Sequence, residues 1–253
     1  RLSSTALESR NRISADWRSL LRLARGADHI RTDGAFPGFV DTDQDQATWQ
    51  NDVNALGGQW AAGLDWRREK VSSDTAYTVS SRRFLGAFGG VSARLGENLI
   101  EASARHDDDS QFGGHATGKF AYGYRFAPQW RASASLGTAF KAPSFNDLYF
   151  PGFGVATLQP ERGRSVEFGL NWTGRNGDAA LTAYRNKVRD LVGYEPDRSF
   201  CPPSVDYDFG CARNTSRARL QGATSKVESK DLRLRTMQGM TGAIEKTQTA
   251  IDD

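Results

Sequence analysis

Apolar and polar residues alternate along much of this chain with a period of two. Between Gln59 and Arg67, for example, Trp60, Leu64 and Trp66 fall on one face of an extended chain, and polar or small residues fall on the other. Such alternation is typical of β-strands whose two faces meet different surroundings. It predicts eleven strands, near residues 2–9, 12–25, 47–55, 59–68, 83–95, 98–107, 118–126, 130–140, 165–174, 178–192 and 213–223.

The predicted connections alternate in length. Short ones fall near residues 10–11, 57–58, 96–97, 127–129 and 175–177. Antiparallel strands joined in this way form a sheet with tight turns at one end and extended loops at the other, as outer-membrane barrels do. The pattern therefore predicts an all-β fold, an antiparallel transmembrane β-barrel. Its long connections are expected near residues 26–46, 69–82, 108–117, 141–164 and 193–212.

Composition supports a barrel wall over a soluble core. Only 38% of the 253 residues are hydrophobic, although the chain carries 6 Trp and 14 Phe, whereas a soluble domain usually has about 45–50% apolar residues. A barrel needs apolar residues on its lipid-facing side alone, and aromatic rings such as Trp60, Trp66, Phe120 and Phe126 fall at or near strand ends, where a lipid headgroup region would lie. A soluble antiparallel sandwich with apolar residues facing inward is the alternative.

Charge and motifs narrow the function. The net charge is only +3, from 33 basic and 30 acidic residues, and they are interspersed, which speaks against a nucleic-acid groove. The sequence contains no Gly-x-Ser-x-Gly elbow, phosphate-binding glycine loop or His-Glu-x-x-His helix. We therefore expect neither an enzyme nor a nucleic-acid partner.

Several motifs resemble the TonB-dependent outer-membrane receptors. They are GTAFKAP at 137–143, LQPE at 158–161 before the strand that contains Glu167, YRNKVRDL at 184–191 and ARLQG at 218–222. Within that family the vitamin B12 (cobalamin) receptors are the most similar. The residues that carry this second likeness are GLDW at 63–66, HDDDSQFGGH at 106–115, and KAP at 141–143 with Tyr149 and GFG at 152–154.

The resemblance implies location in the outer membrane of a Gram-negative bacterium, contact with membrane lipid and uptake of cobalamin driven through TonB. Such receptors form barrels of about 22 strands with a plugged lumen, and the plug domain contacts TonB. The chain opens on Arg1 and carries both methionines near its end, so we expect a fragment with about half the barrel and no plug domain, not competent for transport alone. A siderophore receptor and a passive porin are the alternatives.

The resemblance covers residues 1–224, which we expect to form the partial barrel domain. Residues 225–253 contain no aromatic side chain and no run with a period of two. We therefore expect this segment to be an atypical tail outside the barrel.

The resemblance also points to ligand-facing residues in two long connections. A large ligand bound by loops needs rings and polar groups presented together, and an aromatic loop rich in Pro and Gly is typical of an ordered one. The alternative is that the rings pack on each other. The candidates are Thr75 and Tyr77 in the connection near 69–82, and Tyr149, Phe150 and Phe153 in the connection near 141–164.

Four aspartates in the connection expected at 26–46 form a candidate calcium site. Asp33, Asp41, Asp43 and Asp45 would offer the carboxylate oxygens that calcium prefers, and the resemblance implies calcium-ordered loops near this place. A solvated acidic loop is the alternative, because the spacing does not match an EF-hand.

The two cysteines, Cys201 and Cys211, lie ten residues apart in a loop-like stretch. Their usage suits an oxidising compartment, and a disulfide closing a loop of this size would contribute about 2–3 kcal/mol. Two unpaired thiols are the alternative.

Overall fold

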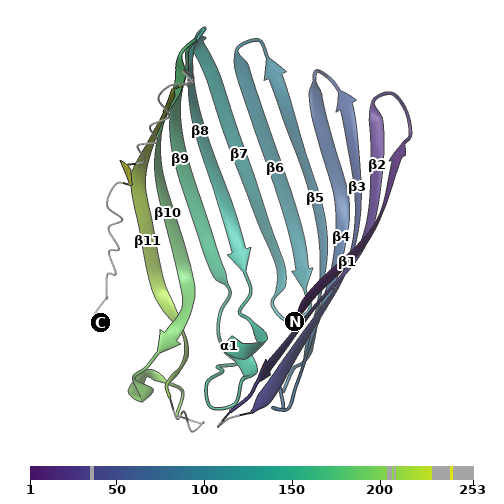
Figure 1. The fold of residues 1–253 in the computed structure, drawn as a ribbon, viewed down its shortest axis with the longest axis vertical. Helices are drawn as coiled ribbons and strands as arrows, with labels where there is room; N and C mark the ends of the chain where they lie inside the picture. The colour runs from purple at the N-terminus through teal and green to yellow at the C-terminus, as the bar shows by residue number, and fades with distance from the viewer. Residues whose placement is uncertain (35–36, 204–206, 208, 230–239, 242–253) are drawn as a thin grey trace.

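The chain folds into one antiparallel sheet whose twelve strands follow each other in sequence order (Figure 1). The computed structural model describes residues 1–34, 37–203, 207, 209–229 and 240–241. The strands are β1 (Leu2–Arg12), β2 (Trp17–Thr32), β3 (Gly38–Ala55), β4 (Gly58–Ser73), β5 (Ser81–Leu95), β6 (Asn98–Asp109), β7 (Gly113–Ala127), β8 (Trp130–Lys141), β9 (Glu161–Thr173), β10 (Gly177–Glu195), β11 (Cys211–Ser229) and β12 (Met240–Thr241). Two short helices, α1 (Phe145–Tyr149) and η1 (Arg198–Phe200), lie between strands.

The predicted all-β antiparallel fold is confirmed, and each of the eleven predicted strands is present. The sheet is open, with β1 at one edge and the two-residue β12 at the other. Strand β11 runs on to Ser229, beyond the boundary expected at residue 224, and Thr224 and Ser225 pair with β12. The division into residues 1–224 and 225–253 stays a prediction, because most of the second segment lies outside the described residues.

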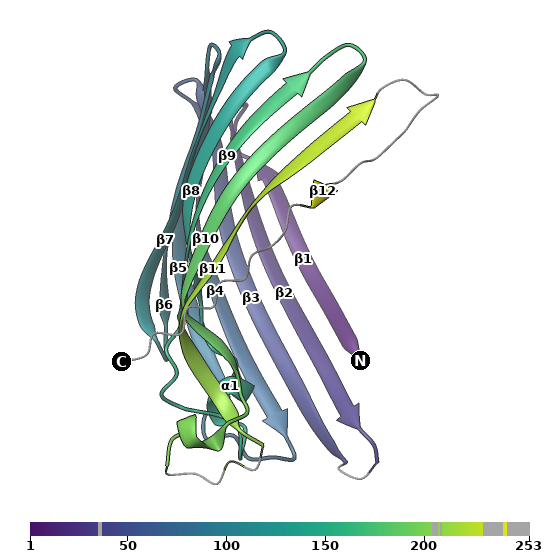
Figure 2. The ribbon, with the colours of Figure 1, turned by 90° about the vertical axis from the view of Figure 1, so that its left-hand side faces the viewer.

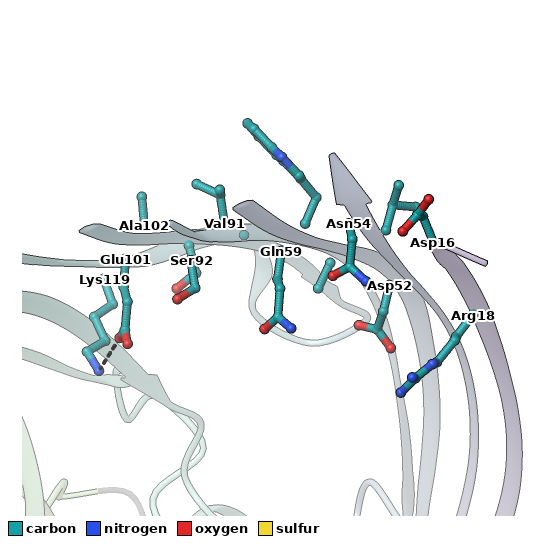
Figure 3. Close-up of a pocket in the computed structure, with 15 residues that line it drawn as sticks. Asp16, Arg18, Asp52, Asn54, Gln59, Val91, Ser92, Glu101, Ala102 and Lys119 are labelled. Carbon is teal, nitrogen blue, oxygen red and sulfur yellow. Dashed lines mark ion pairs between the residues drawn. The ribbon is translucent and has the colours of Figure 1, made fainter. Parts of the chain in front are cut away.

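The two faces of the sheet differ as the alternation predicted. On β4, Trp60 and Leu64 are 44% and 49% exposed on the outer face, while Asp65 on the opposite face takes part in hydrogen bonds. Figure 3 shows the same division near the tight turns. The side chains of Gln59 and Ser92 point to the concave side, together with the Lys119–Glu101 ion pair, whose atoms are 3.9 Å apart. The inner face is therefore polar along its length.

Tight turns and loops segregate to opposite ends of the strands (Figures 1 and 2). At the loop end, two of the predicted long connections are wrong. The expected loop at 26–46 is mostly strand, because β2 continues to Thr32 and β3 begins at Gly38. The expected loop at 108–117 shrinks to three residues between β6 and β7. Both hairpins extend past the region of apolar alternation, where both faces are polar and the period of two loses its contrast.

Buried apolar side chains gather at the loop end. Among the described residues, those that are buried and hydrophobic belong to the loop ends of β4, β5 and β11 or to the connections there. The wall has no such core, since its outer face carries exposed rings such as Trp49 and Phe168. No helix in the described part of the chain is long and apolar enough to cross a membrane.

Candidate functional site

A charged network lines the inner wall on the way to the loop end. Thr48 Oγ1 and Gln46 Nε2 donate hydrogen bonds of 2.7 and 3.1 Å to Asp65 Oδ1. Arg105 Nη2 lies 3.1 Å from Asp65 Oδ2, and its Nε donates to Asp107 at 2.7 Å. Asp65, Arg105 and Asp107 border a hollow of about 650 Å³. The network holds side chains of three strands, β3, β4 and β6, in fixed positions and makes the hollow polar.

Arg82 connects this wall to the loops. Its side chain is almost fully buried, and Nε donates to Glu69 Oε2 at 2.7 Å while Nη1 donates to the carbonyl oxygen of Pro143 at 2.7 Å. The guanidinium also lies over the rings of Phe84 and Phe145, at 5.3 and 4.8 Å from their centroids. Cation–π contacts of this kind add to the ion pair when they are desolvated. Arg82 thus fixes the start of the connection 142–160 on strand β5.

Helix α1 gives the connection 142–160 a defined shape. Ser144 caps the helix by accepting a hydrogen bond from Asp147 N, and the Asp147 carboxylate accepts one from Ser144 N, which is a capping box. Gly154 then folds back onto the helix end, and its N–H donates to the Phe150 carbonyl oxygen at 2.6 Å. A Cβ at Gly154 would lie 2.5 Å from Tyr149 N. Only glycine permits this close approach.

The connection 142–160 packs against the connection 196–210 and the start of β11 in a small apolar core. We call the described residues of 142–160 and 196–210 the loop cap. Ala212 N, at the start of β11, donates to the Phe153 carbonyl oxygen at 2.9 Å. Cys201 and Cys211 form a disulfide with Cα atoms 5.9 Å apart. The buried cluster consists of Leu148, Val155, Leu158, Cys201, Tyr207, Cys211 and Ala212.

Tyr77 brings the connection 74–80 against the loop cap. Its hydroxyl donates to Asn146 Oδ1 at 2.6 Å, and its ring meets Phe150 edge-on with centroids 6.4 Å apart. Burial and the nearby Asp74 carboxylate raise the pKa of the Tyr77 phenol. The phenol therefore stays protonated and keeps its proton for Asn146. Thr75 lies in the same connection, where its N–H donates to Ser73 Oγ at 3.2 Å.

The remaining candidate rings also contact protein groups. The Tyr149 hydroxyl accepts a hydrogen bond from Gln111 Nε2, and burial raises the pKa of this phenol. Phe153 stacks on Tyr194 with centroids 6.2 Å apart. Phe150 remains 37% exposed. The structure therefore brings Tyr77, Tyr149 and Phe150 to one side of α1, and of these rings Phe150 is the exposed one.

Two buried acceptors lie beside Tyr149. Asp109 is 2% exposed, and its Oδ1 accepts a hydrogen bond from Gln111 N. Among the described residues, Asp109 Oδ2 and Gln111 Oε1 have no hydrogen-bond partner. A buried acceptor without a donor is costly, and both oxygens are shielded from solvent in this structure. Sequence reasoning missed Arg82, Asp109 and Gln111; the DSQF run at 109–112 was noticed only as a likeness.

The four candidate calcium ligands do not converge. Asp41, Asp43 and Asp45 lie within β3 on its outer face, and Asp33 lies in the turn after β2. His29 Nδ1 is 3.0 Å from Asp41, and Arg25 Nη2 is 3.2 Å from Asp43. Calcium takes six to eight oxygens, but no group of three or more His, Cys, Asp or Glu suited to a metal occurs among the described residues. These aspartates do not fit a calcium ion here, and calcium binding stays a prediction.

Comparison with known proteins identifies the family of the chain. The family model described as "TonB dependent receptor-like, beta-barrel" matches residues 4–235. The vitamin B12 transporter BtuB of Photobacterium profundum is 31% identical over 72% of this chain and 30% of its own length. BtuB of Vibrio cholerae is 33% identical over 72% of this chain and 31% of its own length. The chain thus spans about a third of these relatives.

Solved structures share the fold at low identity. The ferric enterobactin receptor PfeA of Pseudomonas aeruginosa, as the G324V mutant, superposes with a TM-score of 0.72 and 15% identity, over 89% of this chain and 40% of that one. The copper transporter OprC superposes with a TM-score of 0.70 and 16% identity, over 90% of this chain and 43% of that one. The family match, the open antiparallel wall and the loop-end site agree, and the chain belongs to the β-barrel of the TonB-dependent receptors, which are outer-membrane proteins of Gram-negative bacteria.

Proposed function

We propose that this chain supplies wall and loops to an outer-membrane receptor that takes up cobalamin with energy delivered through TonB. The observation that carries the proposal is the 31–33% identity to vitamin B12 transporters across 72% of the chain. Siderophore receptors share the fold at 13–16% identity. At this level of identity a shared fold does not indicate a shared ligand.

The loop end suits a large ligand with an apolar face and amide groups, as cobalamin has. The exposed ring of Phe150 would contact the apolar face. Opening of the loop end on binding would let the buried acceptors on Asp109 and Gln111 accept from amide N–H groups. The full proposed set of ligand-facing residues is Thr75, Tyr77, Tyr149, Phe150 and Phe153. Tyr77 and Tyr149 contribute mainly by holding α1, through Asn146 and Gln111.

Transport requires more than the sheet described above. Unpaired strand edges are costly in lipid, so the membrane form of this open sheet is proposed to close with further strands. In this family TonB engages the plug domain, which would also complete the ligand site from below. The contribution proposed for the present chain is the polar inner wall and the loop cap.

A competition experiment tests the substrate. The longest product of the gene that encodes this chain is expressed in an outer membrane, and radiolabelled cyanocobalamin is displaced with unlabelled cyanocobalamin or with ferric enterobactin. We expect displacement by cyanocobalamin alone. Preferential binding of the ferric siderophore would establish the alternative receptor class, and ion conductance without TonB would establish a passive porin.

A further inference from the structure

The outer face of β9, β10 and β11 carries a concentration of positive charge. The register of the sheet places Arg162, Arg189 and Arg217 side by side across the three strands. A second row, formed by Arg164, Lys187 and Arg219, lies next to it. Arg185 follows on the side away from the loops. All seven side chains are exposed. We call them the basic patch: Arg162, Arg164, Arg185, Lys187, Arg189, Arg217 and Arg219.

The basic patch adjoins the apolar band of the wall. Along β9 the outer face continues from Arg164 to Val166, Phe168 and Leu170, which are 42%, 60% and 37% exposed. The patch lies on the loop side of these residues. Lipid-facing apolar residues occupy the hydrocarbon region of the membrane, and the longer loops of such barrels lie on the extracellular side. The patch therefore falls at the level of the headgroups of the outer leaflet.

Among the described residues, none forms an ion pair with a cation of the patch. Like charges directly opposite each other on adjacent strands destabilise a sheet, and here two rows hold three cations each. The nearby ion pairs of the described chain, Lys141–Glu161 and Arg213–Glu195, involve other residues. The only side-chain hydrogen bond given by a described patch residue runs from Arg185 Nε to Gln221 Oε1 at 3.2 Å.

Strands near the other edge of the same sheet show that the fold does not impose this concentration of like charges. On β2–β4, also on the loop side of the apolar residues, charges of both signs face each other. Arg25 contacts Asp43 and Asp45, at 3.2 and 3.9 Å, and Lys70 lies opposite Asp43 in the register. Arg25 is thus neutralised by carboxylates of the neighbouring strand, whereas no ion pair to a described residue is formed by the basic patch.

We propose that the basic patch binds the phosphate groups of the glycolipid that forms the outer leaflet of this membrane. Guanidinium groups match phosphate with paired hydrogen bonds, and six of the seven side chains are arginine. The phosphates of a membrane lipid lie where the patch lies, next to the hydrocarbon. The proposal rests on the location of the barrel in the outer membrane and is independent of the ligand transported.

The test compares two triple variants of the longest gene product, purified from outer membranes in detergent. One variant removes the second row through Arg164→Gln, Lys187→Gln and Arg219→Gln. The matched control removes three exposed outer-face cations of β4 and β5 through Arg68→Gln, Lys70→Gln and Arg83→Gln. Heat-dependent gel mobility shows whether each barrel has assembled. Native mass spectrometry then measures binding of deep-rough lipopolysaccharide and of the same glycolipid after removal of its phosphates.

We expect the row variant to bind the phosphorylated glycolipid about 100-fold more weakly than the unmodified protein, at about fivefold for each cation removed. The control variant should change binding less than about threefold. The dephosphorylated glycolipid should bind the unmodified protein as weakly as the row variant binds the phosphorylated one.

Four results would overturn the proposal. They are equal losses in both triple variants, undiminished binding of the dephosphorylated glycolipid, complete displacement by millimolar inorganic phosphate, or an acidic polypeptide retained in place of the glycolipid. If the row variant does not assemble, the single variants are measured, and unchanged affinity in all three also overturns it. Cobalamin binding can fail or succeed in the same preparations without affecting this outcome.

Discussion

Arg82 Nη1 donates a 2.7 Å hydrogen bond to the carbonyl oxygen of Pro143, which ties a side chain of the wall to the loop that carries the candidate ligand residues. The same guanidinium pairs with Glu69 and lies against Phe145. Position and orientation of α1 therefore depend on one buried cation, contributed by a different part of the sequence.

Replacing this cation should loosen the loop. In Arg82→Met, the Pro143 carbonyl loses its donor and Glu69 keeps only its ion pair with Arg67, so local opening of residues 143–158 should become easier by about 1–3 kcal/mol. Hydrogen exchange of peptides from this segment measures the effect. Arg83→Met, which removes an exposed neighbour on the same strand, should leave exchange unchanged; equal exchange in both variants would contradict the role given to Arg82.

Gly154 should not tolerate a methyl group. Gly154→Ala places a Cβ against Tyr149 N and Phe150 N, and relieving such overlap should cost about 1–3 kcal/mol. The measurement is the thermal midpoint of the loop-cap transition, followed by near-ultraviolet circular dichroism. Gly193→Ala is the control, because nothing lies within 4 Å of its ideal Cβ; a midpoint lowered equally there would refute the prediction.

Reduction of the disulfide should destabilise the loop cap and spare the wall. Opening Cys201–Cys211 releases a loop whose closure contributes about 2–3 kcal/mol. Hydrogen exchange should rise in residues 196–212 and stay constant in β4 to β7. A variant with both cysteines changed to serine should behave like the reduced protein and should not respond to reductant.

The phenols of Tyr77 and Tyr149 should ionise later than those of exposed tyrosines. Burial raises the pKa of both groups in the folded protein, so their contribution to stability is complete below the ordinary value of 10 and is lost as the pH rises through the folded pKa. Absorbance at about 295 nm, the tyrosinate band, should show a late step that shrinks in Tyr77→Phe. A Tyr77→Phe titration identical to that of the unmodified protein would count against this prediction.

If cobalamin is the ligand, the ring of Phe150 should matter for affinity. Phe150→Ala should weaken binding about tenfold, or about 1.4 kcal/mol, while heat-dependent gel mobility stays normal. Phe209→Ala, which removes a ring that is 80% exposed in the loop cap, is the matched control. Equal affinities of the two variants in cyanocobalamin titrations would remove Phe150 from the ligand site.

The wall was predictable from sequence because lipid and water impose opposite demands on alternate residues. The strands around Trp60 and Phe168 were recognised through this contrast. The loop end of the β2–β3 hairpin reads as a loop in the sequence because Asp41, Asp43 and Asp45 alternate with other polar residues. Where both faces of a hairpin are polar, apolar and polar residues do not alternate, and the strands cannot be recognised by this pattern.

The site was only partly predictable. The composition of the aromatic loop predicts an ordered segment, and the capping box from Ser144 to Asp147 is a local sequence sign of α1. Arg82, by contrast, reaches Pro143 over 61 positions of sequence. No local pattern distinguishes it from Arg83 beside it, because its burial is created by the register of the sheet and the return of a distant loop.

The small apolar core of the loop cap means that this chain is adapted to two solvents at once. The outer surface of the wall exposes rings such as Trp49 and Phe168, and its stability comes from surrounding lipid. The loop cap hides Leu148 and Leu158 from water and is closed by a disulfide, as a miniature secreted domain would be. Detergent choice should therefore govern the integrity of the wall, while denaturant and redox conditions govern the cap, so that each half can be melted while the other persists.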